Sequence, residues 1–470
     1  MMKRYNVMLL AAVLLLLTAC GGPAPGGTGA TPPPSGEPAP ASAPPSTSRP
    51  TGGKPSVSHD GTIEETVLLE QDGVKITATG LAYTEYSADL SLLLENDSGQ
   101  DLSFRSGTMG YSCNSVNGYM TGDGYLNTDV PAGKKAKETI SFDLDELLIL
   151  GITEIADIEI GFDIQNSDND TYLLTGPLSL KTPLADSYDY TVSTYQQAVS
   201  TGQLSSLYDF TLDYYAEDVV YDQCGVRVTS LALLTNKKGE TALLLEAENT
   251  SEGPVSIATQ QFYLNGLLVQ EGIWDYDTIT SGKRRLITVP LSRLVESSYR
   301  EPLGLTELGS AAFSVELKDA DGNPLAGPEE LSITLPDGPA SFNGEGAVLY
   351  EGEGIRLICK GLLPDEGSYS DDIHMLLLAE NSGTAPVVVQ VDSGSVSVNG
   401  FMTSVWGVGD TVEPGRCTLV DLELRGDSLD GNGITEIAEI TNIEASFEVR
   451  DKNYNTLAEF AITYTAAPGA

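Results

Sequence analysis

Short segments of alternating apolar and polar residues run through most of the chain after residue 60. In the first of them, one set of side chains is apolar and the set between is polar: Val74, Ile76 and Ala78 against Lys75, Thr77 and Thr79. The same register returns later in the chain at Val226 and Val228, and at Ile355, Leu357 and Cys359. A period of two is typical of a β-strand with one buried face. The pattern therefore predicts an all-β protein.

Four short landmarks recur three times in one order. Each copy has Glu-Asn after a run of leucines, then Asn-Gly, then Gly with a basic residue, then Gly-Ile/Leu-Thr-Glu. They begin at Glu95, Asn117, Gly133 and Gly151 in the first copy, at Glu248, Asn265, Gly282 and Gly304 in the second, and at Glu380, Asn399, Gly415 and Gly433 in the third. Their near-constant intervals predict a tandem array with a period of about 120 residues.

Each repeat has the features of a small sandwich. About seven short strands with regular turn signals favour an immunoglobulin-like β-sandwich, and a small closed barrel is the alternative. The Asn-Gly pairs suit tight hairpin turns, which need positive φ angles. One or two helical turns are expected before each Gly-Ile/Leu-Thr-Glu landmark, as at Asp143–Leu150 and Leu291–Ser298. The expected domains are 61–182, 216–336 and 346–466, with a short linker at 337–345 and a Tyr-rich linker at 183–215.

The Tyr-rich linker is expected to be ordered, because tyrosines this frequent are rare in disordered tethers. An added pair of strands is the alternative.

The N-terminal 60 residues lack the alternating pattern of the repeats. Lys3 and Arg4 precede the apolar run Val7–Leu17, which is too short to span a bilayer, so residues 1–19 are predicted to be a signal peptide. Residues 20–60 are rich in Pro and Gly and poor in apolar side chains, which predicts a disordered tether.

The end of the predicted signal peptide, Leu17-Thr18-Ala19-Cys20, resembles the lipobox of bacterial lipoproteins. The resemblance implies that Cys20 becomes the first residue and carries diacylglycerol, and that the protein is extracytoplasmic and anchored by lipid to the bacterial cell membrane. The three repeats, over roughly residues 62–465, resemble the Ig-like repeat domains of uncharacterised, mainly Gram-positive, bacterial surface lipoproteins. That family implies a β-sandwich fold and a surface location, and it implies no particular activity.

Charge and composition exclude several functions. With 67 acidic and 25 basic residues the formal net charge is −42, so nucleic acid is not expected as a partner. The two histidines, His59 and His374, are too few for a histidine-rich metal site. His374 precedes an apolar run and is interpreted as a strand residue. The chain contains neither a Gly-x-Ser-x-Gly elbow nor a phosphate-binding loop, so we expect no enzyme activity and no cofactor.

The remaining cysteines lie at different points of the repeat, so no shared disulfide is encoded: Cys113, Cys224, Cys359 and Cys417. Only the third repeat contains two of them. The alternation places Cys359 on the inward face, whereas Cys417 lies opposite to the inward residues of its strand. A bridge needs side chains that point at each other, so this arrangement disfavours one, and the sequence leaves the disulfide state open.

Two kinds of ligand site remain as hypotheses. Oxygen-rich segments suggest Ca²⁺, although none has EF-hand spacing and solvated hairpin turns are the favoured alternative. Their candidate ligands are Asp319, Asp321 and Asn323, and Asp427, Asp430 and Asn432. One aromatic residue also follows each Asn-Gly pair at a similar distance: Tyr125, Trp274 and Trp406. These aromatics would stack on a glycan, or else pack in the core or at a sheet edge, which is the favoured alternative.

The sequence therefore predicts a non-catalytic, lipid-anchored surface protein whose Ig-like repeats serve for binding or spacing at the envelope, with a glycan or a surface protein as its partner. The alternative is a carbohydrate-binding accessory module of an extracellular hydrolase or transport system. A catalytic role in envelope remodelling is a third hypothesis.

Overall fold

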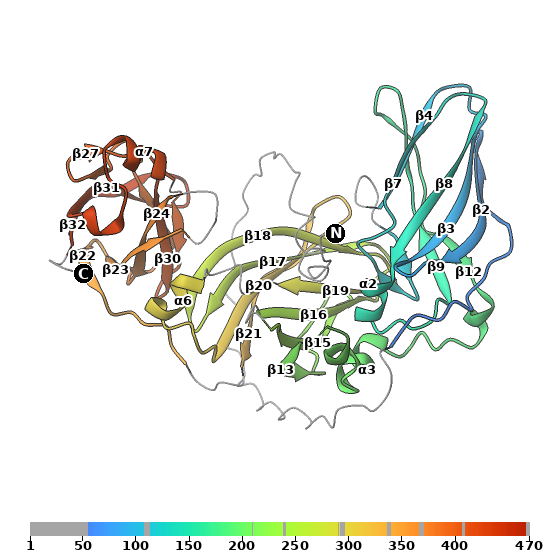
Figure 1. Cartoon of the computed structure of the whole chain (residues 1–470), viewed down its shortest axis with the longest axis horizontal. Helices are drawn as coiled ribbons and strands as arrows, with labels where there is room; N and C mark the ends of the chain where they lie inside the picture. Colours follow the sequence, from blue (N-terminus) through green and yellow to red (C-terminus); the bar gives the residue numbers. More distant parts are fainter. Residues whose placement is uncertain are drawn as a thin grey trace. The chain divides into compact units, whose positions relative to one another are not determined.

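The structure is a computed structural model that describes residues 55–466, except 108–112, 209, 238–240, 290, 292–296, 336–339, 366–370 and 407–408. The predicted signal peptide, Cys20 and most of the predicted tether lie outside the described residues. The described chain is all-β, as predicted, with a few short helices (Figure 1). None of the sheets among the described residues closes on itself, so the sandwich architecture is confirmed over the barrel.

The first repeat contains twelve strands and one α-helix: β1 (Thr66–Gln71), β2 (Val74–Tyr83), β3 (Ser87–Asn96), β4 (Leu102–Ser106), β5 (Ser115–Val116), β6 (Tyr119–Met120), β7 (Leu126–Val130), β8 (Lys134–Asp143), α2 (Leu144–Ile149), β9 (Asp157–Ile160), β10 (Asp163–Asn166), β11 (Thr171–Leu174) and β12 (Leu178–Lys181). The Tyr-rich segment contains η2 (Pro183–Asp186), α3 (Thr194–Ser200), α4 (Gln203–Tyr208) and β13 (Thr211–Ala216).

The second repeat contains β14 (Tyr221–Gln223), β15 (Val226–Thr235), β16 (Thr241–Asn249), β17 (Val255–Leu264), β18 (Leu267–Ile279), β19 (Arg284–Val289), α6 (Ser297–Leu303), β20 (Ser310–Asp319) and β21 (Pro324–Thr334). The third contains β22 (Ala347–Gly352), β23 (Ile355–Pro364), β24 (Ile373–Asn381), β25 (Val387–Val391), β26 (Ser397–Val398), β27 (Phe401–Met402), β28 (Val405–Trp406), β29 (Asp410–Val412), β30 (Cys417–Leu424), α7 (Gly426–Gly431), η3 (Ile437–Glu439), β31 (Asn442–Arg450) and β32 (Thr456–Thr465).

The chain forms two compact units, and the division falls inside the second repeat. The first unit comprises Met1–Ser256, Asp277–Pro290 and Lys318–Asn323, and the second comprises Ile257–Tyr276, Leu291–Leu317 and Pro324–Ala470. No helix of the described residues is long and apolar enough to cross a membrane.

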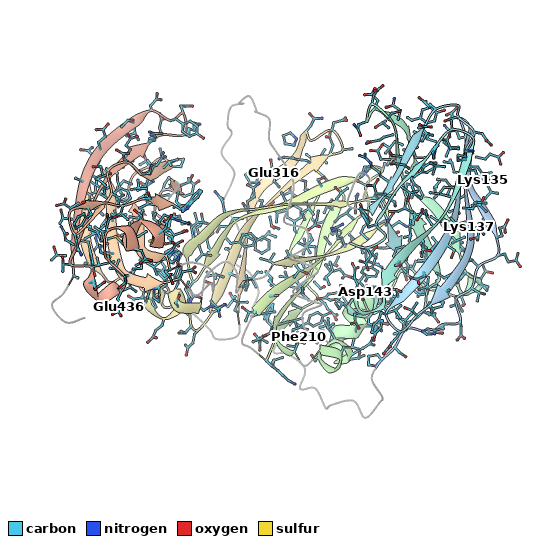
Figure 2. All side chains as sticks on the ribbon, turned by 45° about the horizontal axis from the view of Figure 1, so that its top comes forward. Lys135, Lys137, Asp143, Phe210, Glu316 and Glu436 are labelled. Carbon is cyan, nitrogen blue, oxygen red and sulfur yellow. The ribbon has the colours of Figure 1, made fainter. Side chains whose placement is uncertain are left out.

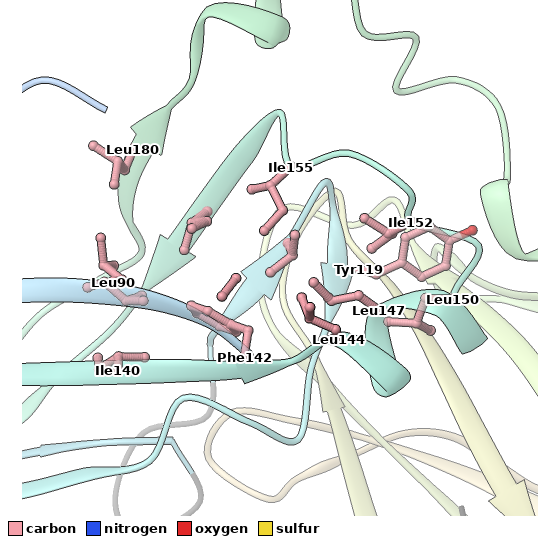
Figure 3. Packing of buried hydrophobic residues seen from close by; sticks show 14 of the residues in the cluster. Leu90, Tyr119, Ile140, Phe142, Leu144, Leu147, Leu150, Ile152, Ile155 and Leu180 are labelled. Atoms are coloured by element: carbon pink, nitrogen blue, oxygen red, sulfur yellow. The ribbon is translucent and has the colours of Figure 1, made fainter. Parts of the chain in front are cut away.

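In the first unit, two four-stranded sheets of the first repeat pack against each other, in the orders β1-β2-β3-β8 and β11-β10-β4-β7. A third sheet runs from the first repeat into the second, in the order β12-β9-β5-β6-β19-β16-β15-β13. Its repeats meet where β6 and β19 run parallel, with Tyr119 opposite Arg284. One hydrophobic core extends from the first repeat through α3 and α4 to β16, and Figure 3 shows the part around Phe142 and Tyr119.

In the second unit, a sheet likewise runs across repeats, in the order β21-β20-β17-β18-β30-β24-β23-β22. The junction is again a parallel pair, β18 with β30, in which Leu267 lies opposite Cys417. The third repeat has a second sheet in the order β27-β26-β31-β25-β29, to which β32 is added through β31. Residues from both sheets form one core, including Leu377 and Leu422 from the first and Val389 and Phe447 from the second.

The Asn-Gly landmarks form hairpin turns, as predicted. The φ angles are 49° and 82° at Asn117 and Gly118, 50° and 86° at Asn265 and Gly266, and 52° and 82° at Asn399 and Gly400. Two consecutive residues with positive φ define the turn that matches the twist of a β-hairpin. Each asparagine side chain also forms a hydrogen bond with the segment that follows the Gly-Ile/Leu-Thr-Glu landmark of its repeat or belongs to that landmark, ahead of β9, β20 or β31. For example, Nδ2 of Asn117 donates to the Glu154 carbonyl at 2.7 Å.

The helical turns expected near Asp143–Leu150 are confirmed by α2. The carboxylate of Asp143, which is labelled in Figure 2, caps the helix by accepting from the backbone N–H of Asp145 at 2.7 Å. Gly151 follows with φ of 71°, and the Ile152 N–H donates to the Leu147 carbonyl at 2.8 Å. This left-handed C-terminal cap explains why the fourth landmark begins with glycine.

Candidate functional site

Three of the exposed large apolar side chains of the third repeat follow its Asn-Gly landmark within seven residues of Asn399, two in β27 and one in β28. Phe401 is 53% exposed, Met402 60% and Trp406 62%. We call these three residues the β27 face. Large apolar side chains that are exposed close together in the chain are candidates for a contact surface, so these residues are the candidate functional site.

The backbone of the β27 face is held by hydrogen bonds to other segments of the third repeat. Oδ1 of Asn399 accepts from the backbone N–H of Thr441 at 2.8 Å, which fixes the turn against the start of β31. Nδ2 of Asn432, just after α7, donates to the Met402 carbonyl at 3.2 Å. The N–H of Ser404 donates to Oγ of Ser428 at 3.0 Å. The backbone of the face is therefore fixed even though its side chains are exposed.

Trp406 is positioned by its strand and by an arginine. It lies in β28, opposite Glu423 of β30, and the Arg425 guanidinium lies 5.8 Å from the centre of its ring. Nη1 of Arg425 also lies 3.1 Å from Oδ2 of Asp372 and 3.1 Å from Oε1 of Glu423. Burial and the neighbouring Asp372 carboxylate raise the pKa of Glu423. An aromatic ring beside fixed charges is able to stack on an apolar or sugar surface and to place polar groups around it.

The other two predicted stacking aromatics differ from Trp406. Tyr125 is 53% exposed, so it does not pack in a core, and it precedes β7 in the first repeat. Trp274 is a residue of β18, and its side chain lies outside the described residues. The favoured alternative in the sequence was packing in the core or at a sheet edge; neither Tyr125 nor Trp406 is buried in a core, and Trp406 lies in the short strand β28, which pairs with β30.

The predicted cation loops are engaged in local structure. Oδ1 of Asp319 accepts from the N–H groups of Asp321 and Asn323, at 3.0 and 2.8 Å, and so closes its own hairpin turn. The Asn323 side-chain amide also donates to this carboxylate, at 3.0 Å, and this bond together with the backbone bonds lowers the pKa of Asp319. Asp427 and Asp430 lie in helix α7, not in an open loop. Within the described residues, no group of three or more His, Cys, Asp or Glu side chains is placed to hold a metal ion.

His374 is a strand residue, as interpreted from the sequence. It lies in β24 and is nearly buried, with Nδ1 3.0 Å from Oδ2 of Asp421. The Tyr299 hydroxyl donates to the same Asp421 oxygen at 2.9 Å. This carboxylate therefore ties helix α6 to β24 and β30.

The four cysteines of the described chain form no disulfide with one another. Cys359 belongs to the third-repeat core, as its inward position predicted, and Cys417 is buried where β30 meets β18. Burial raises the pKa of Cys359 to about 11 and that of Cys417 to about 12. Both thiols are thus poor nucleophiles at neutral pH.

A buried carboxylate that the sequence analysis missed lies in the first unit. Glu246 is completely buried in β16. Its carboxylate accepts from the hydroxyls of Tyr119 at 2.7 Å, Ser193 at 2.6 Å and Thr229 at 2.8 Å, and from Nε2 of Gln196 at 2.7 Å. A glutamate inside the apolar run of β16 was the only signal. Its contacts join β6, α3 and β15, which indicates a structural role.

Two small cavities of the first unit lie near the Tyr-rich segment. One, of about 280 Å³, is lined by residues that include Glu154, Tyr188, Thr194 and Gln197. The other, of about 270 Å³, lies beside Asn117, Tyr190, Glu248 and Arg284. Neither cavity brings together any of the residues that the sequence singled out for ligand binding.

No family model and no curated protein matches the chain. Several solved structures resemble it at 12% identity. An exo-chitosanase of Amycolatopsis orientalis has a TM-score of 0.16, with 50% of this chain and 26% of that chain covered. A 1.5-MDa bacterial ice-binding adhesin has a TM-score of 0.13, with 81% and 90% covered. A protein of unknown function from Porphyromonas gingivalis W83 has a TM-score of 0.14, with 48% and 91% covered. The chain corresponds to only 26% of the exo-chitosanase, and likenesses this low carry no inference about function.

Proposed function

We propose that the protein is a non-catalytic binding protein of the cell surface, anchored by lipid at Cys20 and held out on its tether. Its repeats would act as a spacer, and the β27 face of the third repeat would be its contact surface. The lipobox resemblance of Leu17-Thr18-Ala19-Cys20 supports the location.

The observation that carries this proposal is the contrast between the landmarks and the β27 face. The side chains of the asparagines in the Glu-Asn and Asn-Gly landmarks form hydrogen bonds with backbone groups of their own repeats. Phe401 and Met402 of β27 and Trp406 of β28 instead present apolar surface to solvent from backbone that is held by hydrogen bonds. Because apolar surface left in water is unfavourable, a fixed face of this kind favours a binding role over a purely structural one.

The test uses the predicted mature chain, residues 20–470, with Cys20→Ser so that no lipid is attached. It is incubated with isolated cell envelopes and with a panel of peptidoglycan, plant and host glycans and mucins, and binding is read by pull-down and by Trp fluorescence. We expect Trp406→Ala to weaken binding at least about tenfold, as for a central aromatic contact.

Tyr125→Ala is the matched control, because it removes an exposed aromatic at the corresponding place of the first repeat. Binding that survives Trp406→Ala and Phe401→Ala, in variants that melt at the wild-type temperature, would contradict the β27 face as contact surface.

A carbohydrate-binding accessory module is the second candidate. Trp406 beside the Arg425 guanidinium favours it, since sugars bind by stacking on an aromatic ring with charged groups at their hydroxyls. Specific binding to one glycan of the panel, lost in Trp406→Ala, would select this candidate over a protein ligand.

A further inference from the structure

The β27 face occupies a position that is covered in both preceding repeats. In each of those, the strand that begins directly after Asn-Gly pairs in parallel, through its first residues, with the strand that follows the Gly-plus-basic landmark of the next repeat. The array thus uses one edge-to-edge contact twice, once in each compact unit.

The first contact lies in the first unit. Tyr119 is opposite Arg284, and the Arg284 N–H donates to the Gly118 carbonyl at 2.9 Å. Nζ of Lys283 lies 2.9 Å from Oε2 of Glu159, which is on β9, two strands from β6 in the same sheet. Tyr119 and Met120 are only 1% and 3% exposed. The contact therefore combines a backbone bond, an ion pair and two buried apolar side chains.

The second contact lies in the second unit and has the same register, but the carboxylate of its ion pair comes from another strand, β21. Leu267 and Leu268 are opposite Cys417 and Thr418. Arg416, the counterpart of Lys283, pairs with Glu330 at 3.0 Å and lies 4.9 Å from the centre of the Tyr263 ring. Leu267 and Leu268 are 0% and 1% exposed.

In the third repeat the same edge is open. Strand β27 ends its sheet in the described chain, and Phe401 and Met402 take the positions of Tyr119 and Met120. Glu444 takes the position of Glu159, since it lies opposite Ser397 as Glu159 lies opposite Ser115. Glu444 is exposed. The acceptor half of the contact, with its carboxylate, is thus present without its partner strand.

The donor half is open in the first repeat. Strand β8 follows Gly133 as β19 follows Gly282 and β30 follows Gly415, but β8 ends its sheet in the described chain. Lys134 and Lys135 are the counterparts of Lys283 and Arg284, and both are exposed. Lys135 and Lys137 of this strand are labelled in Figure 2.

We propose that the β27 face binds strand β8 of a second copy of this chain, head to tail. This rests on the proposed function, because it names the partner of the same contact surface. By the register of the two internal contacts, Phe401 lies opposite Lys135 and Met402 opposite Ala136 of the second copy. The Lys135 N–H donates to the Gly400 carbonyl, and the Lys134 ammonium pairs with Glu444.

Charge favours this partner over a pairing of like ends. Two β8 edges would bring lysines against lysines, which is how edge strands avoid one another. The third repeat is strongly acidic, so it attracts the lysine edge and repels another β27 face. A contact between two different surfaces is heterologous, and it builds rings or open chains of copies.

The test measures the mass of the predicted mature chain, with Cys20→Ser, by sedimentation velocity from about 1 μM to about 1 mM, a range that covers weak association. We expect oligomers to grow with concentration and to dissociate in high salt. Phe401→Asp and the double variant Lys134→Glu, Lys135→Glu should each remain monomeric, with the association constant reduced at least about tenfold. Leu457→Asp is the matched control, since Leu457 is 58% exposed elsewhere in the third repeat, and it should associate like wild type.

Mixing the two monomeric variants tests the direction of the contact. Each retains one intact half, so they should form a one-to-one dimer that grows no further. A wild-type chain that stays monomeric throughout the range overturns the proposal, and so does association that persists in Phe401→Asp. Association lost in Phe401→Asp but kept in the lysine variant also overturns it, because the face would then bind itself. Envelope and glycan binding, measured on the same samples, shows separately whether the proposed function stands.

Discussion

The three buried asparagines of the Glu-Asn landmark act as identical loop staples. Nδ2 of Asn96 donates to the carbonyls of Gln100 and Val130, at 2.8 and 2.7 Å. Asn249 and Asn381 bond the corresponding carbonyls of their own repeats at 2.8 to 2.9 Å. One side chain thereby satisfies backbone groups of two loops, and no apolar residue is able to replace it.

We therefore expect Asn381→Ala to lower the free energy of unfolding by about 2–4 kcal/mol, because it leaves the Ala385 and Val412 carbonyls without their donor. Urea denaturation of the predicted mature chain measures this. Asn127→Ala is the control, since Asn127 is exposed on β7, and it should change stability little. Equal effects of the two substitutions would contradict the staple.

A carboxyl pair in the first repeat makes stability depend on pH. Burial and the nearby Asp123 carboxylate raise the pKa of Glu146 to about 8. Oε1 of Glu146 accepts from the Gly122 N–H at 2.9 Å, so it holds the loop that carries Asp123. Between about pH 4.5 and 8 the folded chain keeps a proton that the unfolded chain has lost.

Because the pKa of Glu146 is higher in the folded chain than in the unfolded chain, protonation of Glu146 stabilises the fold. This stabilisation is complete below about pH 4.5 and is lost as the pH rises to about 8. Glu146 is partly reached by solvent, so we expect a loss of about 1–3 kcal/mol across that window. Glu146→Gln keeps the neutral form and should flatten the dependence, which urea denaturation at pH 5 and pH 8 measures. The exposed Glu85→Gln is the control, and an unchanged pH dependence in Glu146→Gln would refute this origin.

At the scale of elements, Glu246 links the helices of the Tyr-rich segment to the sheet. Its position in β16 corresponds to Leu93 and Leu378 of the other repeats, so the glutamate replaces an apolar residue of the repeat. The donors Tyr119, Ser193 and Gln196 come from β6 and from the start of α3. The carboxylate therefore compensates for polar groups that would otherwise be buried without an acceptor.

Glu246→Ala should lower the free energy of unfolding of the first unit by about 3–5 kcal/mol, because several buried donors lose one acceptor. Glu246→Gln keeps the volume and one acceptor oxygen and should cost less. Denaturation together with hydrogen exchange of the α3 amides measures both effects. The exposed Glu252→Ala serves as control, and α3 protection unchanged in Glu246→Ala would argue against the link.

At the scale of the whole molecule, the proposed anchor governs where the repeats act. If Cys20 is acylated, Cys20→Ser should move the protein from the membrane fraction to the medium or periplasm and abolish its labelling by radioactive palmitate, because the acyl chains supply the membrane affinity. Cys224→Ser, at an exposed cysteine of the second repeat, is the control. Membrane retention without Cys20 would require another anchor.

The sequence by itself determined the features of the fold that depend on residues close together in the chain. Alternation gave the strands, Asn-Gly gave the hairpins with positive φ, and Gly151 gave the left-handed end of α2, because each depends on backbone sterics within a few residues. The threefold recurrence of these local signals predicted the repeats. The same reasoning predicted helical turns before each fourth landmark, and α7 lies at that place in the third repeat. It also treated Asp427 and Asp430 as loop ligands, because Asp is typical of loops and turns, whereas both belong to this helix.

Only the tertiary structure decided which of the equivalent residues in the three repeats are buried and which are exposed. Tyr119, Leu267 and Phe401 all follow Asn-Gly, yet two are covered by the next repeat and the third is exposed. The exposure of Trp406 and the buried acceptor role of Glu246 likewise depend on partners far along the chain. Burial at a sheet edge is a property of the pair of strands that meet there, so one strand's sequence does not contain it.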